Sequence, residues 1–278
     1  MAENNGKKAT LGWIGAGRMG SAMVARMATA GEDIAVWNRT VQKAEELTRY
    51  GASVAESIAA LRGRDVVFTN VSTADVLKEV LLGEGGLLAE KPSTTRVLVD
   101  FSTVSPQDSA DIRAACTEAG VEFLAAPVSG NAKVVEAGLL TIAVSGPESA
   151  FKSVEYLLEH ICHTAAYVGD GDVSRLVKIA HNLLLGVVTQ SLAEITVLAQ
   201  KGGVSRSAFL DFLNNSVLGS GFTRYKTPAF VNLDYTPTFT PLLLRKDFDL
   251  GLTAARELEV PMPVASITAA LILSLIHI

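Results

Sequence analysis

A glycine-rich turn near the start of the chain constrains the fold more than any other feature. The stretch T-L-G-W-I-G-A-G-R-M-G, residues 10–20, reads as a short apolar strand followed at once by a helix. Its glycines have the G-x-G-x-x-G spacing, in which the first makes a tight turn, the second leaves room for a pyrophosphate and the third lets helix and strand pack closely. The sequence therefore predicts a phosphate site at the helix N-terminus, formed by Gly15, Ala16, Gly17, Arg18, Met19 and Gly20.

The second strand of this unit ends where a dinucleotide-binding fold meets the adenosine ribose. Ile34 to Trp37 is followed by Asn38, Arg39 and Thr40. An acidic residue at this point would accept a hydrogen bond from the ribose 2′-hydroxyl and favour NAD, whereas an arginine can pair with a 2′-phosphate. The sequence therefore predicts NADP(H) as the cofactor. The alternative is an ordinary strand–helix–strand unit that carries a surface arginine.

Apolar strands and helices alternate along the first part of the chain. Strands are predicted at 51–54, 65–70, 97–100, 122–125, 140–144 and 165–168, and helices at 41–50, 56–61, 76–82, 106–119 and 148–159. This alternation predicts a parallel, doubly wound α/β sheet of the Rossmann type, which binds ligands at the carboxyl ends of its strands. Val71, Ser72 and Thr103 follow such strands and are predicted to face the cofactor; helix capping is the alternative for Ser72 and Thr103.

The chain changes character after Val168. From Val173 to Lys201 there is no proline, and Gly186 alone interrupts an apolar, helix-favouring segment. Because its apolar residues lie nearly all round, we expect a long helix that is buried on most faces and forms a spine between domains or subunits. Further helices are predicted at 205–215 and 242–258. The predicted organisation is a Rossmann domain at 1–168 and an all-α domain at 169–278, assembled as a homodimer or homotetramer.

The last stretch, from Val260 to Ile278, contains no Asp, Glu, Lys or Arg and is about as long as a membrane span. Its prolines and hydroxyl residues favour a buried helix that starts near Pro263 instead, so no membrane partner is expected. The closing L-S-L-I-H-I has neither a polar cap nor a charged end. We expect it to be a truncated or foreign ending and leave it out of the fold argument.

Composition excludes several classes of partner. The 278 residues include 24 Lys and Arg against 29 Asp and Glu, a net charge of −5 without a basic block, which argues against nucleic acid. The two cysteines form no disulfide framework, and the N-terminal segment shows no signal-sequence pattern. These features predict a cytoplasmic protein. His160, Cys162 and His163 crowd together like metal ligands, but no fourth ligand stands at a recognised spacing, so no metal is predicted.

Lys178 and Asn182 stand four residues apart and therefore share one face of the long predicted helix. A lysine and an amide in an apolar helix require a polar partner or a wet cleft, because an unpaired buried charge is costly. The alternative is a lysine whose ammonium reaches solvent while its stem covers apolar surface. Spacing alone leaves both open.

Four motifs in order resemble the β-hydroxyacid dehydrogenase family. They are G-A-G-R-M-G-S-A-M from Gly15, A-P-V-S-G-N at 126–131, the run from Gly171 to Asn182 that contains Lys178, and L-R-K-D-F-D-L from Leu244. The family includes 3-hydroxyisobutyrate dehydrogenases, tartronate semialdehyde reductases, and glyoxylate and succinic semialdehyde reductases. The resemblance implies an enzyme that interconverts a small carboxylate-bearing aldehyde and its hydroxy acid by hydride transfer with NADP(H).

The resemblance also implies a role for individual residues. Lys178 would be the catalytic acid and base, and Asn182 its neighbour and a substrate ligand. An ammonium suits this chemistry, since negative charge grows on the carbonyl oxygen as hydride arrives at the carbon. The remaining roles are substrate carboxylate binding by Ser129 and Gly130, with Asn131 in the same loop, and cofactor contacts by Thr103 and Lys246.

The sequence departs from the family pattern near the substrate. Asn131 replaces the second glycine of P-V-S-G-G, Leu139 stands where threonine is common, and His181 replaces an asparagine. These differences leave the substrate open. Two alternatives remain: an imine reductase, although that group generally lacks the lysine, and a non-catalytic NADP-binding module that senses redox state.

Overall fold

The computed structural model describes residues 8–234, 236 and 240–277. The chain forms two units, Met1–Lys178 and Ile179–Ile278. The division falls inside helix α7 (Val173–Lys201) and not before it, where the sequence analysis placed a boundary at Val168.

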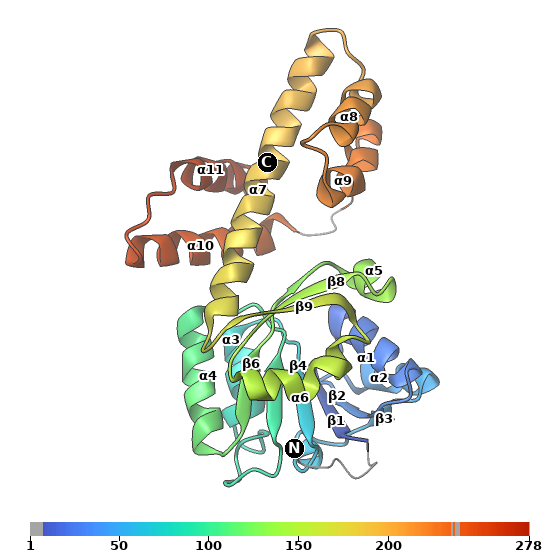
Figure 1. Ribbon diagram of the computed structural model, residues 1–278, viewed down its shortest axis with the longest axis vertical. Coiled ribbons are helices and arrows are strands. Elements are labelled where there is room, and N and C mark those ends of the chain that lie inside the picture. Colours follow the sequence, from blue (N-terminus) through green and yellow to red (C-terminus); the bar gives the residue numbers. More distant parts are fainter. Residues whose placement is uncertain (1–7, 235, 237–239, 278) are drawn as a thin grey trace. The chain divides into compact units, whose positions relative to one another are not determined.

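The first unit contains one sheet with the order β3-β2-β1-β4-β5-β6-β8-β7, to which β9 is added beside β8 (Figure 1). Neighbours from β3 to β6 are parallel. This arrangement confirms the predicted Rossmann architecture. The strands are β1 Thr10–Ile14, β2 Asp33–Trp37, β3 Ser53–Val54, β4 Val66–Thr69, β5 Val97–Asp100, β6 Glu122–Ala125, β7 Val128–Ser129, β8 Leu140–Ser145 and β9 Cys162–Gly169.

The far edge of the sheet was not expected from the sequence. Strand β8 runs antiparallel to both β6 and β7, and β9 then pairs with β8 in parallel. The short strand β7 lies inside the A-P-V-S-G-N motif, which the sequence analysis left without secondary structure. This edge therefore holds the motif in a strand pair with β8.

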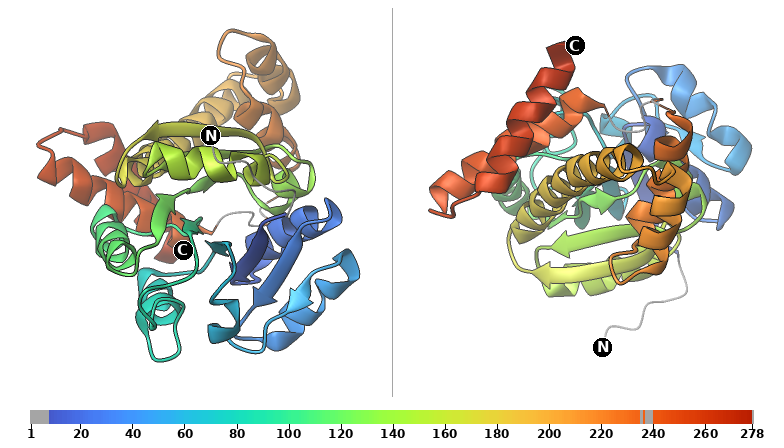
Figure 2. Two further views of the ribbon diagram at one scale, coloured as in Figure 1. Left: turned by 60° about the horizontal axis from the view of Figure 1, so that its bottom comes forward. Right: turned by 90° about the horizontal axis from the view of Figure 1, so that it is seen from above.

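Helices cover both faces of this sheet (Figure 2). Helices α1 and α6 pack on one face, and α3 and α4 on the other. Two predicted helices are shorter than expected: 41–50 breaks after Glu45, and 56–61 is only a 3₁₀ turn, in which Ser57 Oγ accepts from the Ala60 N–H. The helical segments are α1 Arg18–Thr29, α2 Val41–Glu45, η1 Thr48–Tyr50, η2 Ala59–Leu61, α3 Ala74–Leu82, α4 Pro106–Glu118, α5 Ala132–Glu136 and α6 Glu148–Leu158.

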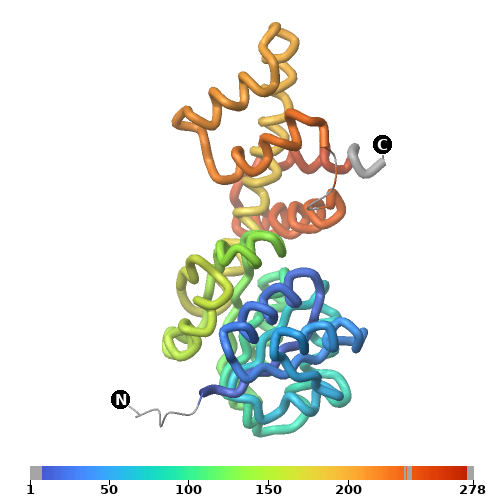
Figure 3. The backbone as a smooth tube through the Cα atoms, turned by 90° about the vertical axis from the view of Figure 1, so that its right-hand side faces the viewer, coloured from blue at the N-terminus to red at the C-terminus, as the bar shows by residue number. Residues whose placement is uncertain are grey.

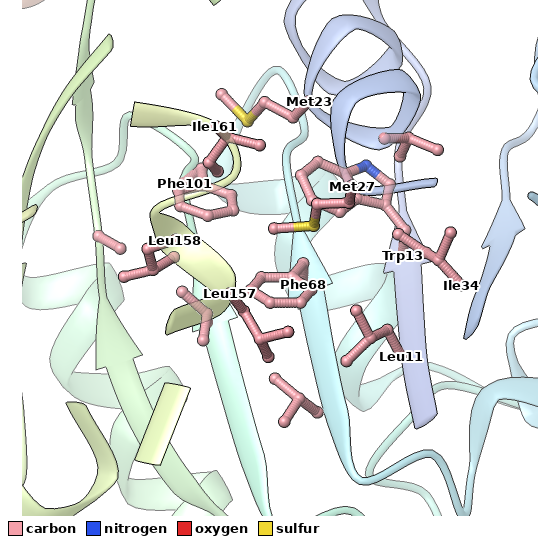
Figure 4. Packing of buried hydrophobic residues seen from close by; sticks show 14 of the residues in the cluster. Leu11, Trp13, Met23, Met27, Ile34, Phe68, Phe101, Leu157, Leu158 and Ile161 are labelled. Atoms are coloured by element: carbon pink, nitrogen blue, oxygen red, sulfur yellow. The ribbon is translucent and has the colours of Figure 1, made fainter. Parts of the chain in front are cut away.

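An aromatic stack lies at the centre of the α1 and α6 face. The rings of Trp13, Phe68 and Phe101 lie 5.4 to 5.8 Å apart between centroids and are fully or almost fully buried. Met23 and Met27 of α1 lie beside them, as Figure 4 shows. Burial of each such side chain contributes about 1.5–3 kcal/mol to the free energy of unfolding. The loops at the ends of these strands are therefore anchored on a well-packed core.

Within the described residues, the elements of the second unit are all helices: the rest of α7, then α8 Arg206–Asn215, α9 Gly221–Asn232, α10 Pro241–Glu257 and α11 Pro263–His277. Helix α7 has the predicted bounds, and α11 begins at the predicted Pro263. Helices α10 and α11 lie side by side (Figure 3). Glycines allow α10 to approach α7 closely, because a Cβ at Gly186 would lie 2.4 Å from the Phe248 ring and one at Gly251 would lie 2.4 Å from Leu183.

The expectation that α7 is buried on most faces is wrong for the single chain. Only 28% of its most apolar 18-residue window is buried, and Leu184, Ile195 and Leu198 are exposed. Among the described residues, α7 is the helix long and apolar enough to cross a membrane, but core helices of soluble proteins pass the same test of length and composition. Ile278, the end of the L-S-L-I-H-I segment, lies outside the described residues.

Candidate active site

The three glycines of the first turn serve two different purposes. Gly15 has φ +102°, and a Cβ there would lie 2.3 Å from the Asn70 carbonyl oxygen. A Cβ at Gly20 would lie 2.1 Å from the carbonyl oxygen of Gly15. Gly17 is exposed, and a Cβ there would meet no atom within 4 Å. The first and third glycines are thus required by the protein itself, whereas the second leaves open space.

Helix α1 begins at this open space without a side-chain cap. Its N-cap is Gly17, and no acidic residue occupies its first turn. Uncapped amides at a helix N-terminus, together with the helix dipole, favour a bound anion. The open space and the free helix end therefore fit a pyrophosphate. Of the other predicted contacts in this turn, Arg18 is exposed, Met19 is partly exposed and Ala16 is buried.

The end of β2 is tied to the glycine turn. Asn38 Oδ1 accepts from the Ala16 N–H at 2.8 Å, and Asn38 Nδ2 donates to the Thr40 carbonyl oxygen at 2.8 Å. Asn38 therefore shapes the loop, which the sequence analysis did not foresee. Arg39 and Thr40 are exposed, and within the described residues Arg39 forms no ion pair. The guanidinium is thus available to a ligand at the carboxyl edge of the sheet.

The loops after β4 and β5 are joined to each other. The Val71 N–H donates to Ser102 Oγ at 3.0 Å. Helix α3 is capped by Thr73 and α4 by Ser105, so neither Ser72 nor Thr103 caps a helix. Capping, the alternative explanation for these two residues, does not occur. Val71, Ser72 and Thr103 follow the carboxyl ends of parallel strands, and their cofactor contacts stay a prediction.

The loop of the A-P-V-S-G-N motif is built around one strained glycine. Gly130 has φ +143°, and a Cβ there would lie 2.9 Å from side-chain atoms of Leu140 and Val134. Asn131, by contrast, has an extended backbone with φ −128° and caps α5 by accepting from the Val134 N–H at 3.2 Å. The family's second glycine is therefore not required here. Ser129 lies in β7, opposite Thr141 of β8.

Lys178 lies in the second turn of α7 and is half-buried. It is the last residue of the first unit. The helix starts at Val173, so Lys178 is carried by backbone that is already hydrogen-bonded and does not belong to a loop. Its position is therefore set by whatever fixes the first turn of α7.

Asn182 stands one turn further along α7, in the second unit, and is 5% exposed. Its Nδ2 donates to Asp247 Oδ2 at 2.6 Å, and its Oδ1 lies 3.0 Å from His181 Nδ1. Asp247, on α10, is itself buried, whereas His181 is exposed. The carboxylate thus holds the asparagine amide in one orientation, and within the second unit it joins Asn182 to the L-R-K-D-F-D-L motif.

Asp247 is a residue that the sequence analysis missed. A signal was present, because Asp247 falls on the same buried helical stripe as Phe248, Gly251 and Ala254. A carboxylate on an apolar stripe requires a buried partner. Lys246, its predicted cofactor-binding neighbour, is partly exposed.

The crowded histidines and cysteine do not form a metal site. His160 Nε2 lies 3.3 Å from Glu32 Oε1. Burial raises the pKa of the Cys162 thiol to about 11. In the part of the chain that the structure describes, no three His, Cys, Asp or Glu side chains gather so as to hold an ion.

Comparisons with known proteins match both units. Residues 10–169 match the family profile of the NAD binding domain of 6-phosphogluconate dehydrogenase. Residues 169–277 match the profile described as the NAD-binding domain of NADP-dependent 3-hydroxyisobutyrate dehydrogenase. Together these profiles cover nearly the whole chain.

Two relatives and one solved structure agree with the profiles. The chain is 32% identical to 2-(hydroxymethyl)glutarate dehydrogenase of Eubacterium barkeri, over 94% of this chain and 87% of that protein. It is 31% identical to glyoxylate/succinic semialdehyde reductase 1 of Arabidopsis thaliana, over 92% and 89%. A Mycobacterium tuberculosis 3-hydroxyisobutyrate dehydrogenase, solved with L-serine, superposes with a TM-score of 0.85 at 26% identity, over 97% of this chain and 94% of that one. The chain therefore belongs to the β-hydroxyacid dehydrogenase family of NAD(P)-dependent oxidoreductases.

Proposed function

We propose that this protein interconverts a small carboxylate-bearing aldehyde and its hydroxy acid, with NADP(H) as cofactor and Lys178 as the acid and base. One observation carries the proposal. Lys178 precedes by one helical turn an asparagine whose amide is fixed by the buried Asp247, in a chain that belongs to a family of dehydrogenases.

The proposed reaction needs a proton where negative charge develops. The chemistry that NADPH supplies when bound is transfer of a hydride to the carbonyl carbon. Lys178 Nζ then donates a proton to the carbonyl oxygen, and in the oxidation direction the neutral amine accepts it from the alcohol. The ammonium also stabilises the developing alkoxide before the proton moves. Asn182 orients the same oxygen or the substrate beside it.

A carboxylate on the substrate is proposed from the loop after β6. The Ser129 hydroxyl can donate a hydrogen bond to a carboxylate. The Gly130 N–H, a second possible donor, lies in a turn with φ +143°, a conformation that would be strained for any residue other than glycine. The relatives' names point to the same class of compound, because glyoxylate, succinic semialdehyde and 2-(hydroxymethyl)glutarate all carry carboxylates. Asn131 caps α5 from this loop, and we propose that it helps to select among such substrates.

Arg39 is proposed to select NADPH over NADH. Replacing Arg39 by Asp should remove the partner of the 2′-phosphate and supply an acceptor for the 2′-hydroxyl. A hydrogen-bonded charge contributes on the order of 1.5–3 kcal/mol, so we expect a loss of roughly ten- to a hundredfold in the kcat/KM preference for NADPH. The measurement is kcat/KM with each cofactor for the wild type and the variant. Equal values for the two cofactors in the wild type would remove the reason for choosing NADP(H).

The assay for the proposed activity follows NADPH oxidation with glyoxylate, succinic semialdehyde and tartronate semialdehyde. Matched aldehydes without a carboxylate serve as controls, and cyclic imines are tested in parallel. We expect turnover of at least one carboxylate-bearing aldehyde and much weaker turnover of its uncharged analogue. Turnover of imines alone would favour imine reduction, and cofactor binding without any turnover would favour a non-catalytic module.

We also propose that the protein assembles with itself through the exposed apolar face of its second unit. Leu184, Ile195 and Leu198 recur at helical spacing on α7, and Phe212 and Leu218 are more than two-thirds exposed nearby in the chain. Monomeric proteins rarely expose large apolar patches, and most soluble oligomers join identical chains. Light scattering at micromolar concentration should give the mass of a dimer or tetramer. A monomeric mass would contradict this part of the account.

A further inference from the structure

The first turn of α7 contains a buried arginine that the proposed chemistry does not use. Arg175 is 1% exposed and lies three residues before Lys178. Its Nη2 lies 2.6 Å from Asp100 Oδ2, and its Nη1 donates to the Ser102 carbonyl oxygen at 2.5 Å. Its Nε donates to Ser109 Oγ at 3.0 Å. The three donor nitrogens of the guanidinium are therefore directed at the end of β5, at the loop that follows it and at α4.

The partner carboxylate extends this network to the loop after β4. The second oxygen of Asp100, Oδ1, accepts from Thr69 Oγ1 at 2.6 Å and from the Ser102 N–H at 3.1 Å. Ser102 Oγ accepts in turn from the Val71 N–H at 3.0 Å. One chain of hydrogen bonds therefore joins the ends of β4 and β5, and the loops that follow them, to the start of α7.

A neighbouring residue of α7 is tied to the same edge of the sheet. Ser174 Oγ donates to the Ala125 carbonyl oxygen, at the end of β6, at 2.8 Å. The Ser174 N–H donates to Ser145 Oγ, at the end of β8, at 3.1 Å. With Arg175 held on β5, the first turn of α7 is fixed both along its axis and in rotation.

A buried ion pair is an inefficient way to add stability, because desolvation offsets most of the attraction and apolar residues of similar volume do as well. A planar guanidinium fork, however, efficiently fixes the orientation of the helix that carries it, because each N–H requires its acceptor in one place. The network at Arg175 therefore indicates positioning more strongly than stabilisation.

We propose that Arg175 is a positioning residue, which sets Lys178 relative to the loops after β4 and β5 through Asp100 and Ser102. This inference rests on the proposed function, because it assumes that Lys178 is the acid and that these loops face the cofactor. Lys178 follows Arg175 on the same helix, so a shift of the first turn moves the ammonium with it. A displacement of about 1 Å in a reacting group is sufficient to lower a rate by about a hundredfold.

The test is Arg175→Ala, assayed with and without added guanidinium ion. We expect kcat for aldehyde reduction to fall about a hundredfold, with a much smaller change in the Kd of NADPH, because the acid is displaced while the phosphate cradle is not. Guanidinium ion should bind in the vacated space beside Asp100 and restore part of kcat. Arg175→Lys keeps the charge but not the fork, and should remain impaired.

A matched control is offered by the opposite end of the sheet. There the N–H and Oγ1 of Thr10 donate to Asp65 Oδ2 at 2.8 and 2.9 Å, a polar link that is remote from α7. Thr10→Val should lower the melting temperature without changing kcat, and guanidinium ion should have no effect on it. Loss of stability alone therefore cannot account for the result expected at Arg175.

If Arg175→Ala does not fold, Ser109→Ala decides the question. It removes the acceptor of Arg175 Nε and the hydroxyl that donates to Asp172 Oδ1, but it leaves Arg175 on Asp100 and Ser102, and Asp172 keeps its ion pair with Arg113. A reduced kcat with an unchanged Kd for NADPH in that variant supports positioning. Wild-type kcat in a folded Arg175→Ala, or in Ser109→Ala where Arg175→Ala does not fold, overturns it. The proposed function fails separately, if Lys178→Ala keeps wild-type turnover.

Discussion

Replacing Lys178 by alanine is expected to lower kcat for aldehyde reduction by about two to four orders of magnitude, the usual contribution of a positioned general acid. The Kd of NADPH and the melting temperature should change little, because the side chain is half-buried at the surface of α7 and is not part of the core clusters. Steady-state kinetics and calorimetry on the same preparation separate the two effects.

Two further variants control this result. Lys178→Arg keeps the positive charge but does not release a proton near neutral pH, so it should also be impaired if the residue is an acid and not merely an electrostatic anchor. Lys201→Ala removes an exposed lysine from the last turn of the same helix and should leave kcat unchanged. Wild-type turnover in Lys178→Ala would show that another group donates the proton.

Replacing Gly17 by alanine is expected to weaken NADPH binding by about a hundredfold or more while leaving the fold intact. The new methyl group would meet no protein atom within 4 Å, so it occupies only the space in which the pyrophosphate would lie against the start of α1. Titration of the cofactor and a thermal melt of the protein without cofactor are the two measurements.

Gly20→Ala is the matched control, because its Cβ would lie 2.1 Å from the backbone oxygen of Gly15. We expect that variant to be destabilised even without the cofactor, in contrast to Gly17→Ala. Wild-type affinity for NADPH in Gly17→Ala would mean that the open space at this glycine is not where the phosphates bind.

The regular parts of the fold could be predicted from the sequence because they depend on local patterns. Periods of apolar residues with glycine and proline at their ends gave the bounds of β5, β6 and α7 without error. Helix α9 was missed, because Pro228 lies inside it and proline argues against a helix interior. A capping box at Ser220, which accepts from the Thr223 N–H, starts this helix nonetheless.

The antiparallel edge of the sheet could not be predicted in the same way. Strand β7 has two residues, which is too short for any alternation to be visible, and its direction is set by pairing with β8. Asn131 is a single position at which the local sequence was likewise insufficient to predict the structure. The sequence showed only that a glycine was missing, whereas the structure shows an extended backbone and a helix cap.

The same contrast between local patterns and long-range pairing applies to the candidate site. The resemblance of four motifs to a known family pointed to Lys178 and Asn182 as candidates, whereas spacing alone did not, and neither revealed the residues that support them. The pairs Asn182–Asp247 and Arg175–Asp100 join residues that are 65 and 75 positions apart, and nothing in the local sequence identifies a partner at such a distance. A charged residue in an apolar segment shows that a partner is needed, and the fold determines which one it is.

The most direct test of the account is the transfer of deuterium from NADPH that carries deuterium at both C4 positions of the nicotinamide. Incubation with the best carboxylate-bearing aldehyde, followed by mass spectrometry of the product, should show one deuterium on the carbinol carbon of the hydroxy acid. The same incubation with Lys178→Ala should yield labelled product at a rate lower by about two to four orders of magnitude. Unlabelled hydroxy acid, or no product with any aldehyde while NADPH still binds, would contradict the account.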